Sequence, residues 1–127
     1  MMVAGIGCRA GASAQEIEGA LMAALEQAGV ETPLRAIATS ATKAVEAGIA
    51  AVARARGVDL IALPQAALEA VAARALTHSP RVQAVAGVPS VAETAALAAA
   101  GPGARLLAPR LALGPVTCAL ATGEDVS

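Results

Sequence analysis

The chain has 127 residues, with 9 Lys and Arg against 10 Asp and Glu, and it contains no Phe, Tyr or Trp. This length fits one domain that buries roughly two-thirds of its extended-chain surface. With a net charge of −1 and no aromatic rings to stack on bases, the composition argues against nucleic acid as a partner. Hydrophobic residues, led by alanine, make up 57% of the chain, so we expect a core of small aliphatic side chains.

The sequence has no membrane-spanning or secretory signature. The apolar window at residues 91–101 is interrupted by Glu93 and is too short to cross about 30 Å of hydrocarbon. A basic region ahead of a long apolar segment, typical of a secretory signal, is not apparent at the start. Cys8 and Cys118 are far apart, unlike the cysteines of a disulfide-stapled scaffold. We expect a cytoplasmic protein without a membrane partner.

The first half of the chain alternates predicted strands and helices. The predicted segments are strands at 2–8, 34–39 and 58–63, and helices at 13–28, 43–56 and 65–73. The first helix opens with Ser13 and Glu16, which have capping-box spacing. Gly29 and Gly57 are natural stops for the first two helices. This alternation is typical of a parallel sheet covered by helices.

The second half adds a helix and two more strands. Residues 77–86 are predicted as an irregular link with room for a short strand, and 110–115 as a loop or hairpin. The further segments are a helix at 90–100, strands at 106–109 and 116–121, and a frayed polar tail from Thr122. Since the last two strands can pair antiparallel, we expect a single α/β domain over residues 1–127. Its predicted architecture is three-layer α/β/α with a mixed, mainly parallel sheet.

The turn GIGCRAG, residues 5–11, is a candidate anion site. It has one residue too many for a dinucleotide fingerprint, and the second strand ends without a carboxylate for a ribose. Nevertheless, Gly7 and Gly11 allow close backbone approach, the following helix favours an anion, and Arg9 offers a planar fork for a carboxylate. The alternative is a structural turn with Arg9 in solvent.

Cys8 has two interpretations. A thiol beside an arginine near a helix start can have a lowered pKa and act as a nucleophile. Its usual assistant is a histidine, but the single one, His78, lies in the irregular link, so apolar packing is preferred. Two cysteines and one histidine without ligand spacing also predict no metal site.

Lys43 and Glu46 open the second predicted helix. Their ordinary interpretation is an i,i+3 ion pair worth a few tenths of a kcal/mol. A lysine in the first turn opposes the helix dipole, however, which favours an anionic partner there. Glu46 is then a candidate to orient Lys43 or to act as an acid or base, so both residues are tentative catalytic candidates.

Gly87 begins a second glycine-containing turn, followed by Ser90 and Glu93 with capping-box spacing. Capping explains Ser90 and Glu93, and a ligand role is the alternative. Arg110 follows Pro109 beyond a predicted strand end. We therefore expect three cations, namely Arg9, Lys43 and Arg110, to meet with the two glycine turns on one rim suited to a ligand with several carboxylates.

Taken in order, these motifs resemble the CobE family of cobalamin biosynthesis, which is equivalent to the C-terminal domain of CbiG. The motifs are GIGCRxG at 5–11, KxxExG at 43–48, GVxSVAExAA at 87–96, PR at 109–110 and TCA at 117–119. The resemblance covers residues 3–121. Arg110 replaces the lysine usual after that proline, and Val45 replaces a residue that is often polar or acidic.

The resemblance implies a role in building the corrin ring. Its expected partner is a corrinoid or precorrin intermediate, fringed with acetate and propionate groups, with other pathway enzymes as further candidates. CbiG resembles an enzyme that opens a δ-lactone of a cobalt-containing precorrin intermediate and releases acetaldehyde.

Three functions remain open at this point. The chain binds the intermediate, or it hydrolyses the lactone, or it serves as an interaction module of the pathway. In the hydrolase, Glu46 or Glu93 is the general base and Lys43 or Arg9 stabilises the oxyanion. No cofactor is expected, and the oligomeric state is left open.

Overall fold

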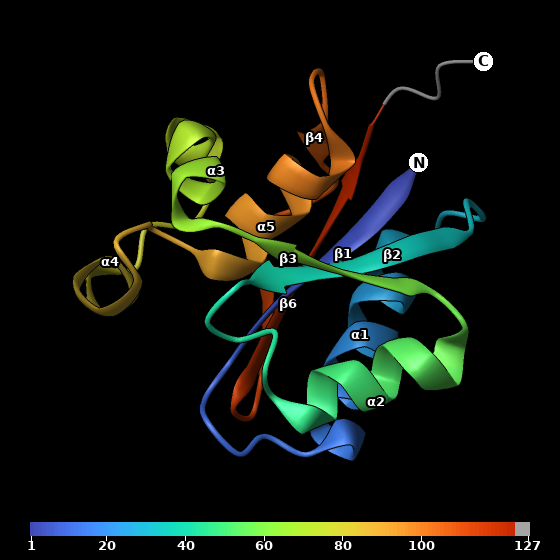
Figure 1. Cartoon of the computed structure of the whole chain (residues 1–127). Helices are drawn as coiled ribbons and strands as arrows, with labels where there is room; N and C mark the ends of the chain where they lie inside the picture. Colours follow the sequence, from blue (N-terminus) through green and yellow to red (C-terminus); the bar gives the residue numbers. More distant parts are fainter. Residues whose placement is uncertain (124–127) are drawn as a thin grey trace.

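A computed structural model describes residues 1–123, which form one sheet with helices on both sides (Figure 1). The strands are β1 (Met2–Cys8), β2 (Leu34–Ser40), β3 (Asp59–Leu63), β4 (Arg105–Leu106), β5 (Leu111–Leu113) and β6 (Val116–Thr122). The helices are α1 (Ala14–Ala28), α2 (Ala47–Arg56), α3 (Gln65–Ala70), α4 (Pro80–Ala86) and α5 (Val91–Ala100), with a 3-10 turn at Ala72–Arg74.

The sheet has the order β3-β2-β1-β6-β4, and β5 also pairs with β6. β1, β2 and β3 are parallel neighbours, whereas β6 pairs antiparallel with β1, β4 and β5. Within residues 1–123, β6 therefore runs against the direction shared by the other strands. This confirms the predicted mixed, mainly parallel sheet.

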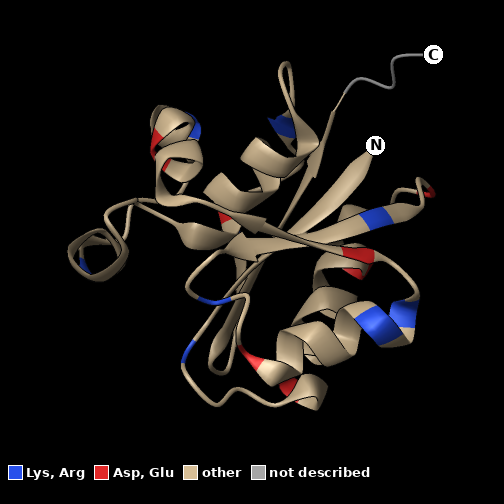
Figure 2. Ribbon diagram, viewed as in Figure 1, with Lys and Arg blue, Asp and Glu red and all other residues tan. Residues whose placement is uncertain are grey.

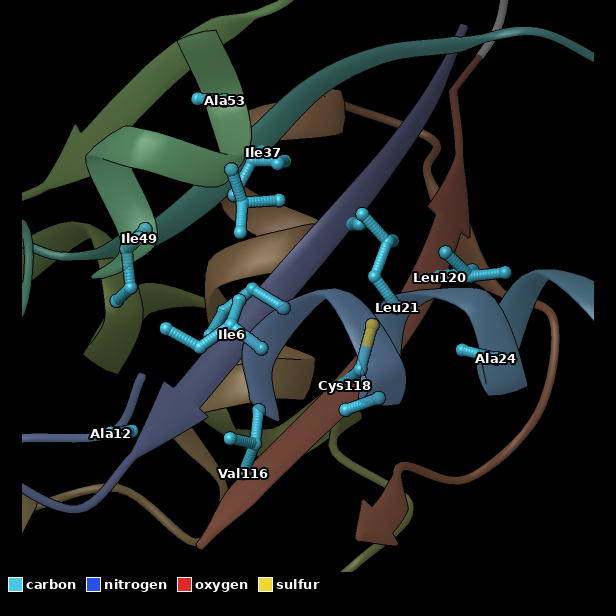
Figure 3. Packing of buried hydrophobic residues seen from close by; sticks show 14 of the residues in the cluster. Ile6, Ala12, Leu21, Ala24, Ile37, Ile49, Ala53, Val116, Cys118 and Leu120 are labelled. Atoms are coloured by element: carbon cyan, nitrogen blue, oxygen red, sulfur yellow. The ribbon is translucent and has the colours of Figure 1, made fainter. Parts of the chain in front are cut away.

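The helices form two outer layers, as predicted. α1 and α2 cover one face of the sheet, and α3 and α5 cover the other (Figure 1). On the first face, side chains of β1, β2, β6, α1 and α2 interlock, and Figure 3 shows Ile6, Leu21, Ile37, Ile49 and Cys118 among them. Contacts between these aliphatic side chains fix both helices on the sheet.

On the second face, small residues bring α5 very close to β1. A Cβ added at Gly5 would overlap the carbonyl oxygen of Ala92 and lie 2.8 Å from the backbone nitrogen of Ala96. Only glycine permits this approach. The close contact explains how a chain without aromatic side chains can still pack its helix and sheet densely.

The predicted helix at 43–56 begins later than expected, at Ala47. The carbonyl oxygen of Ser40 accepts hydrogen bonds from the N–H groups of Lys43 (3.0 Å) and Ala44 (2.9 Å), and its hydroxyl lies 3.2 Å from the same Lys43 nitrogen. A serine that captures nearby N–H groups favours a turn over a helix. Lys43 consequently lies on a loop after β2, and the predicted opposition to a helix dipole does not apply.

The prediction of an irregular link at 77–86 is also wrong, because most of this segment forms α4. The Ser79 hydroxyl accepts a hydrogen bond from the Val82 N–H at 3.3 Å, and Pro80 occupies the first helical position. Both residue types are typical of a helix start. α4 buries none of its residues, so no apolar periodicity marked it.

The C-terminal expectations need two corrections. In place of a strand at 106–109, the structure has β4 at Arg105–Leu106 and a separate β5 within the expected hairpin. Thr122 is not frayed, since it pairs with Met2 in the sheet, and the Gly123 N–H donates to the Met1 carbonyl oxygen at 2.8 Å. The rest of the expected tail, 124–127, lies outside the described residues.

No single helix in residues 1–123 has the length and apolar character needed to span a bilayer. α4 and α5 meet those criteria only when taken together, and they are bent by 65° at the break between them.

Candidate functional site

An open cavity of about 380 Å³ lies where β1 and β2 end. Its walls come from the β1–α1 turn, the loop after β2, helix α4, the start of α5 and the hairpin before β6. The lining residues are Gly7, Cys8, Arg9, Lys43, Ser79, Arg81, Val82, Val85, Ala86, Val91, Arg110, Gly114, Pro115 and Thr117. The carboxyl ends of parallel strands are the usual place for ligands in open α/β sheets.

Four cationic side chains surround this cavity. Arg9, Lys43 and Arg110, the three cations predicted for one rim, all line it, and Arg81 of α4 is a fourth. Figure 2 shows the basic segments of the loops that follow β1 and β2 on this side of the molecule. None of the described lining residues is acidic, so the lining of the cavity is positively charged.

The backbone of the glycine turn is bonded to two neighbouring segments. The Arg9 N–H donates to the Pro115 carbonyl oxygen at 3.0 Å, and the Gly11 N–H donates to Glu46 Oε1 at 2.8 Å. These two N–H groups are already occupied, which leaves the Arg9 side chain, not a cradle of amides, as the turn's main contribution to the cavity. Gly11 has φ +81°, a value that favours glycine, and it does not line the cavity.

Glu46 is a structural tie between two loops. Its carboxylate joins the residue before α2 to the β1–α1 turn, and Glu46 is not among the lining residues. By fixing the turn that carries Arg9 to the loop that carries Lys43, it sets the relative position of two cations.

Cys8 lines the cavity and is half-buried. Burial raises the pKa of its thiol, the charge of Lys43 partly opposes this rise, and Glu46 adds to it. The thiol is therefore protonated near neutral pH, and His78 is exposed and is not among the lining residues. This geometry favours a packing and lining role over a nucleophile. In residues 1–123 no three His, Cys, Asp or Glu side chains gather as metal ligands.

Ser90 and Glu93 are buried behind the cavity and do not line it. The Ser90 hydroxyl caps α5 by accepting from the Glu93 N–H at 3.2 Å. The predicted capping box is only half correct, because the Glu93 side chain accepts hydrogen bonds from Leu76, Thr77 and Arg110 instead. Gly87 ends α4 with φ +73° and lies against Gln65, outside the cavity lining.

The sequence analysis missed the α4 wall of the cavity. Arg81, Val82 and Val85 lie on this helix, and Val85 is 84% exposed. The available signal was the pair Ser79-Pro80, a capping residue followed by proline, which indicates a helix start even where no apolar face exists.

Comparison with known proteins agrees with this fold. Residues 2–121 match the family described as "Cobalamin synthesis G C-terminus". No curated protein matches the chain.

The chain is similar to crystal structures that include the following three. CobE, a protein from the cobalamin (vitamin B12) biosynthetic pathway, is 34% identical with a TM-score of 0.89, covering 95% of this chain and 89% of CobE. The cobalamin biosynthesis protein chiG from Agrobacterium tumefaciens is 46% identical with a TM-score of 0.80, covering 98% and 100%. A putative cobalamin biosynthesis protein G homolog from Sulfolobus solfataricus is 21% identical with a TM-score of 0.69, covering 98% of this chain and 37% of the homolog, and it supports the fold alone.

The family match and the two closer similarities span nearly all the residues that build the sheet and the cavity. They agree with the motifs noted in the sequence. The chain therefore belongs to the CobE and CbiG C-terminal family of cobalamin biosynthesis proteins.

Proposed function

We propose that this protein binds a polycarboxylate corrinoid or precorrin intermediate in the cavity at the ends of β1 and β2. The observation that carries the proposal is the gathering of Arg9, Lys43, Arg81 and Arg110 around one opening without a lining carboxylate. The cytoplasmic location of the protein remains a prediction.

The charges suit the fringe of such a ligand. Acetate and propionate groups extend from several sides of a corrin ring, and each can accept two hydrogen bonds from an arginine or meet the point charge of a lysine. The four cations come from four separate segments, so they surround the opening on several sides. A ligand with one carboxylate would leave most of them unpaired, which favours a ligand with many.

The walls suit the faces of the ring. Val82, Val85 and Ala86 of α4 and Val91 of α5 give the cavity an apolar side. Burying this surface against a flat macrocycle would contribute about 25 cal/mol per Å². The volume of about 380 Å³ together with the open mouth fits partial enclosure of a large ring.

The test is a titration of the protein with a purified corrin polycarboxylic acid, followed by absorbance of the ring. The matched ligand is the same ring with its carboxylates esterified. We expect the acid to bind, the affinity to fall as salt is added, and the ester to bind much more weakly. Equal binding of acid and ester would overturn the electrostatic basis of the proposal.

Variants locate the site. Arg9→Ala and Lys43→Ala should each weaken binding about fivefold to tenfold, since each removes a charged contact worth about 1 kcal/mol. Arg54→Ala is the control, because Arg54 is exposed on α2, outside the cavity lining, and its loss changes the net charge equally. Unchanged affinity in the two cavity variants would contradict the proposed site.

The same samples distinguish the other two functions. Release of acetaldehyde from the δ-lactone intermediate would assign hydrolysis, with Lys43 and Glu46 as the first residues to vary. Failure of the acid to bind, with retention of another pathway enzyme on a column, would assign an interaction module.

A further inference from the structure

Glu93 has an unusual position for a charged residue. It lies in the first turn of α5, is fully buried, and does not line the cavity. Its Oε1 accepts hydrogen bonds from the N–H groups of Leu76 and Thr77, both at 2.8 Å. Its Oε2 accepts from the Thr77 hydroxyl and from the Arg110 N–H, also at 2.8 Å.

These four bonds explain how the charge is tolerated. Burial of an unpaired carboxylate is strongly unfavourable, but four donors and the positive end of α5 replace the lost water. All four partners donate to the carboxyl oxygens, so each oxygen accepts two hydrogen bonds in place of water. No basic side chain takes part in this arrangement, so all the donors come from neighbouring backbone and one hydroxyl.

The partners of Glu93 lie at the base of two cavity walls. Leu76 and Thr77 lie four and three residues before α4, the helix that carries Arg81. The Arg110 N–H belongs to a residue whose own side chain lines the cavity. One carboxylate on the rigid α5 thus joins the two segments that carry Arg81 and Arg110.

We propose that Glu93 is a positioning residue that holds the segments carrying Arg81 and Arg110 at the spacing required by the ligand carboxylates. The proposal rests on the proposed function for its ligand. It assigns Glu93 no contact with that ligand, in contrast to a general base.

The variant Glu93→Gln tests the proposal at one bond. The amide oxygen can replace Oε1 and keep the Leu76 and Thr77 N–H groups, and the amide nitrogen can donate to the Thr77 hydroxyl oxygen. The Arg110 N–H, however, would then face another N–H donor and lose its acceptor. The substitution therefore separates the Arg110 wall from α5 while it preserves the α4 wall. Glu26→Gln, exposed on α1, is the matched control.

The first measurement is hydrogen exchange of the backbone amides by NMR, which needs no ligand. In Glu93→Gln we expect the Arg110 amide to exchange at least fivefold faster and the Leu76 and Thr77 amides to change less. Thr77→Val, which removes only the hydroxyl donor, provides a second variant if Glu93→Gln does not fold. It should speed exchange in α4 and weaken binding about threefold. Unchanged exchange at these amides would overturn the proposal.

The second measurement is a double-mutant cycle for binding of the corrin acid. Glu93→Gln should weaken binding about tenfold in the otherwise unaltered chain but less than threefold in Arg110→Ala, where no guanidinium remains to be misplaced. In Arg54→Ala the full tenfold loss should persist. Equal losses in all backgrounds would indicate a general loosening of the fold and would overturn the positioning role.

The two measurements separate this inference from the proposed function. Failure of the unaltered chain to bind the acid refutes the proposed function, and the exchange rates then decide whether Glu93 fixes the two segments. Normal binding with additive losses refutes only the inference.

Discussion

Two walls of the cavity are built in different ways. The wall formed by the β1–α1 turn and the β5–β6 hairpin continues from paired strands, and the Arg9 N–H is bonded to Pro115 across it. The wall formed by α4 has no buried residue. α4 is linked to the rest of the molecule by hydrogen bonds at its two ends, from Ser79 N–H to Pro89 and from Gln65 to Ala86.

This difference teaches which half of the site can adapt. A wall supported by a strand ladder keeps its cations in place, whereas a seven-residue helix without a buried face opens at low free-energy cost. The side formed by the β1–α1 turn and the β5–β6 hairpin is therefore the more rigid one, while α4, beyond its attachment to Glu93 through Leu76 and Thr77, is the side that can adjust.

The largest expected effect comes from disrupting the close contact between β1, which supports the fixed wall, and α5. In Gly5→Ala the new methyl group would overlap the Ala92 carbonyl, so β1 and α5 must separate. We expect the free energy of unfolding to fall by at least about 3 kcal/mol, measured by urea denaturation and circular dichroism.

Gly19→Ala is the control for that change. Gly19 lies within α1, and its added methyl group would have ordinary contact at 3.9 Å with Leu113. Since alanine favours a helix over glycine, this variant should be more stable by up to about 1 kcal/mol. Equal stability of Gly5→Ala and the unaltered chain would refute the close approach of α5.

A smaller effect is expected when the same substitution is made at the start of α1, which packs in the core, and at the start of α4, which does not. Ser13→Ala and Ser79→Ala each remove an N-cap hydroxyl, worth about 1 kcal/mol of helix stability. On α1, which packs in the core, the loss should lower global stability by about that amount in urea. On α4 it should leave the global midpoint unchanged and speed amide exchange within α4 about fivefold. A similar global loss in both variants would show that α4 is as firmly integrated as α1.

The smallest effect concerns the cysteine at the end of β1. Burial raises the pKa of the Cys8 thiol above the value of 9.0 for a free thiol. Its thiolate fraction at pH 8 is therefore lower than that of a free thiol. Alkylation by iodoacetamide, followed by mass spectrometry, should therefore be slower at pH 8 than that of a free thiol, and its rate should still rise with pH where the rate of a free thiol has levelled off.

The second cysteine and Lys43 provide controls for this titration. Burial raises the pKa of the Cys118 thiol to about 12, so Cys118 should react only through global opening. Lys43→Ala should slow the reaction of Cys8 further, because it removes the charge that favours the thiolate. Rapid modification of Cys8 at pH 7 would show that the fixed wall is more open than described.

Most of the sheet was predictable because its signals are local. Pro33 precedes β2, Pro64 follows β3, and Ser13 with Glu16 forms the expected capping box. The meeting of Arg9 and Lys43 was also predictable, because the carboxyl ends of adjacent parallel strands lie at one edge.

The missed features depend on tertiary contacts. α4 has no buried face, so hydrophobic periodicity gives no sign of it, and Arg81 was missed with it. Glu93 has capping-box spacing, but its carboxylate accepts hydrogen bonds from Leu76, Thr77 and Arg110 instead. These donors are 16 or 17 positions away along the chain, so the local spacing does not reveal them. α2 begins later than predicted because Ser40 forms a turn with Lys43, and helix propensity alone does not reveal this turn.

The pairing of Met2 with Thr122 has a practical consequence. Both ends of the described chain lie at the amino-terminal end of β1, whereas the cavity lies at its carboxyl end. A short linker between the ends, with new termini opened in the exposed segment 29–33, would give a circular permutant in which every cavity loop remains uncut. A reporter domain joined ahead of Met1 or directly after Gly123 would likewise start at the end of β1 that is remote from the cavity.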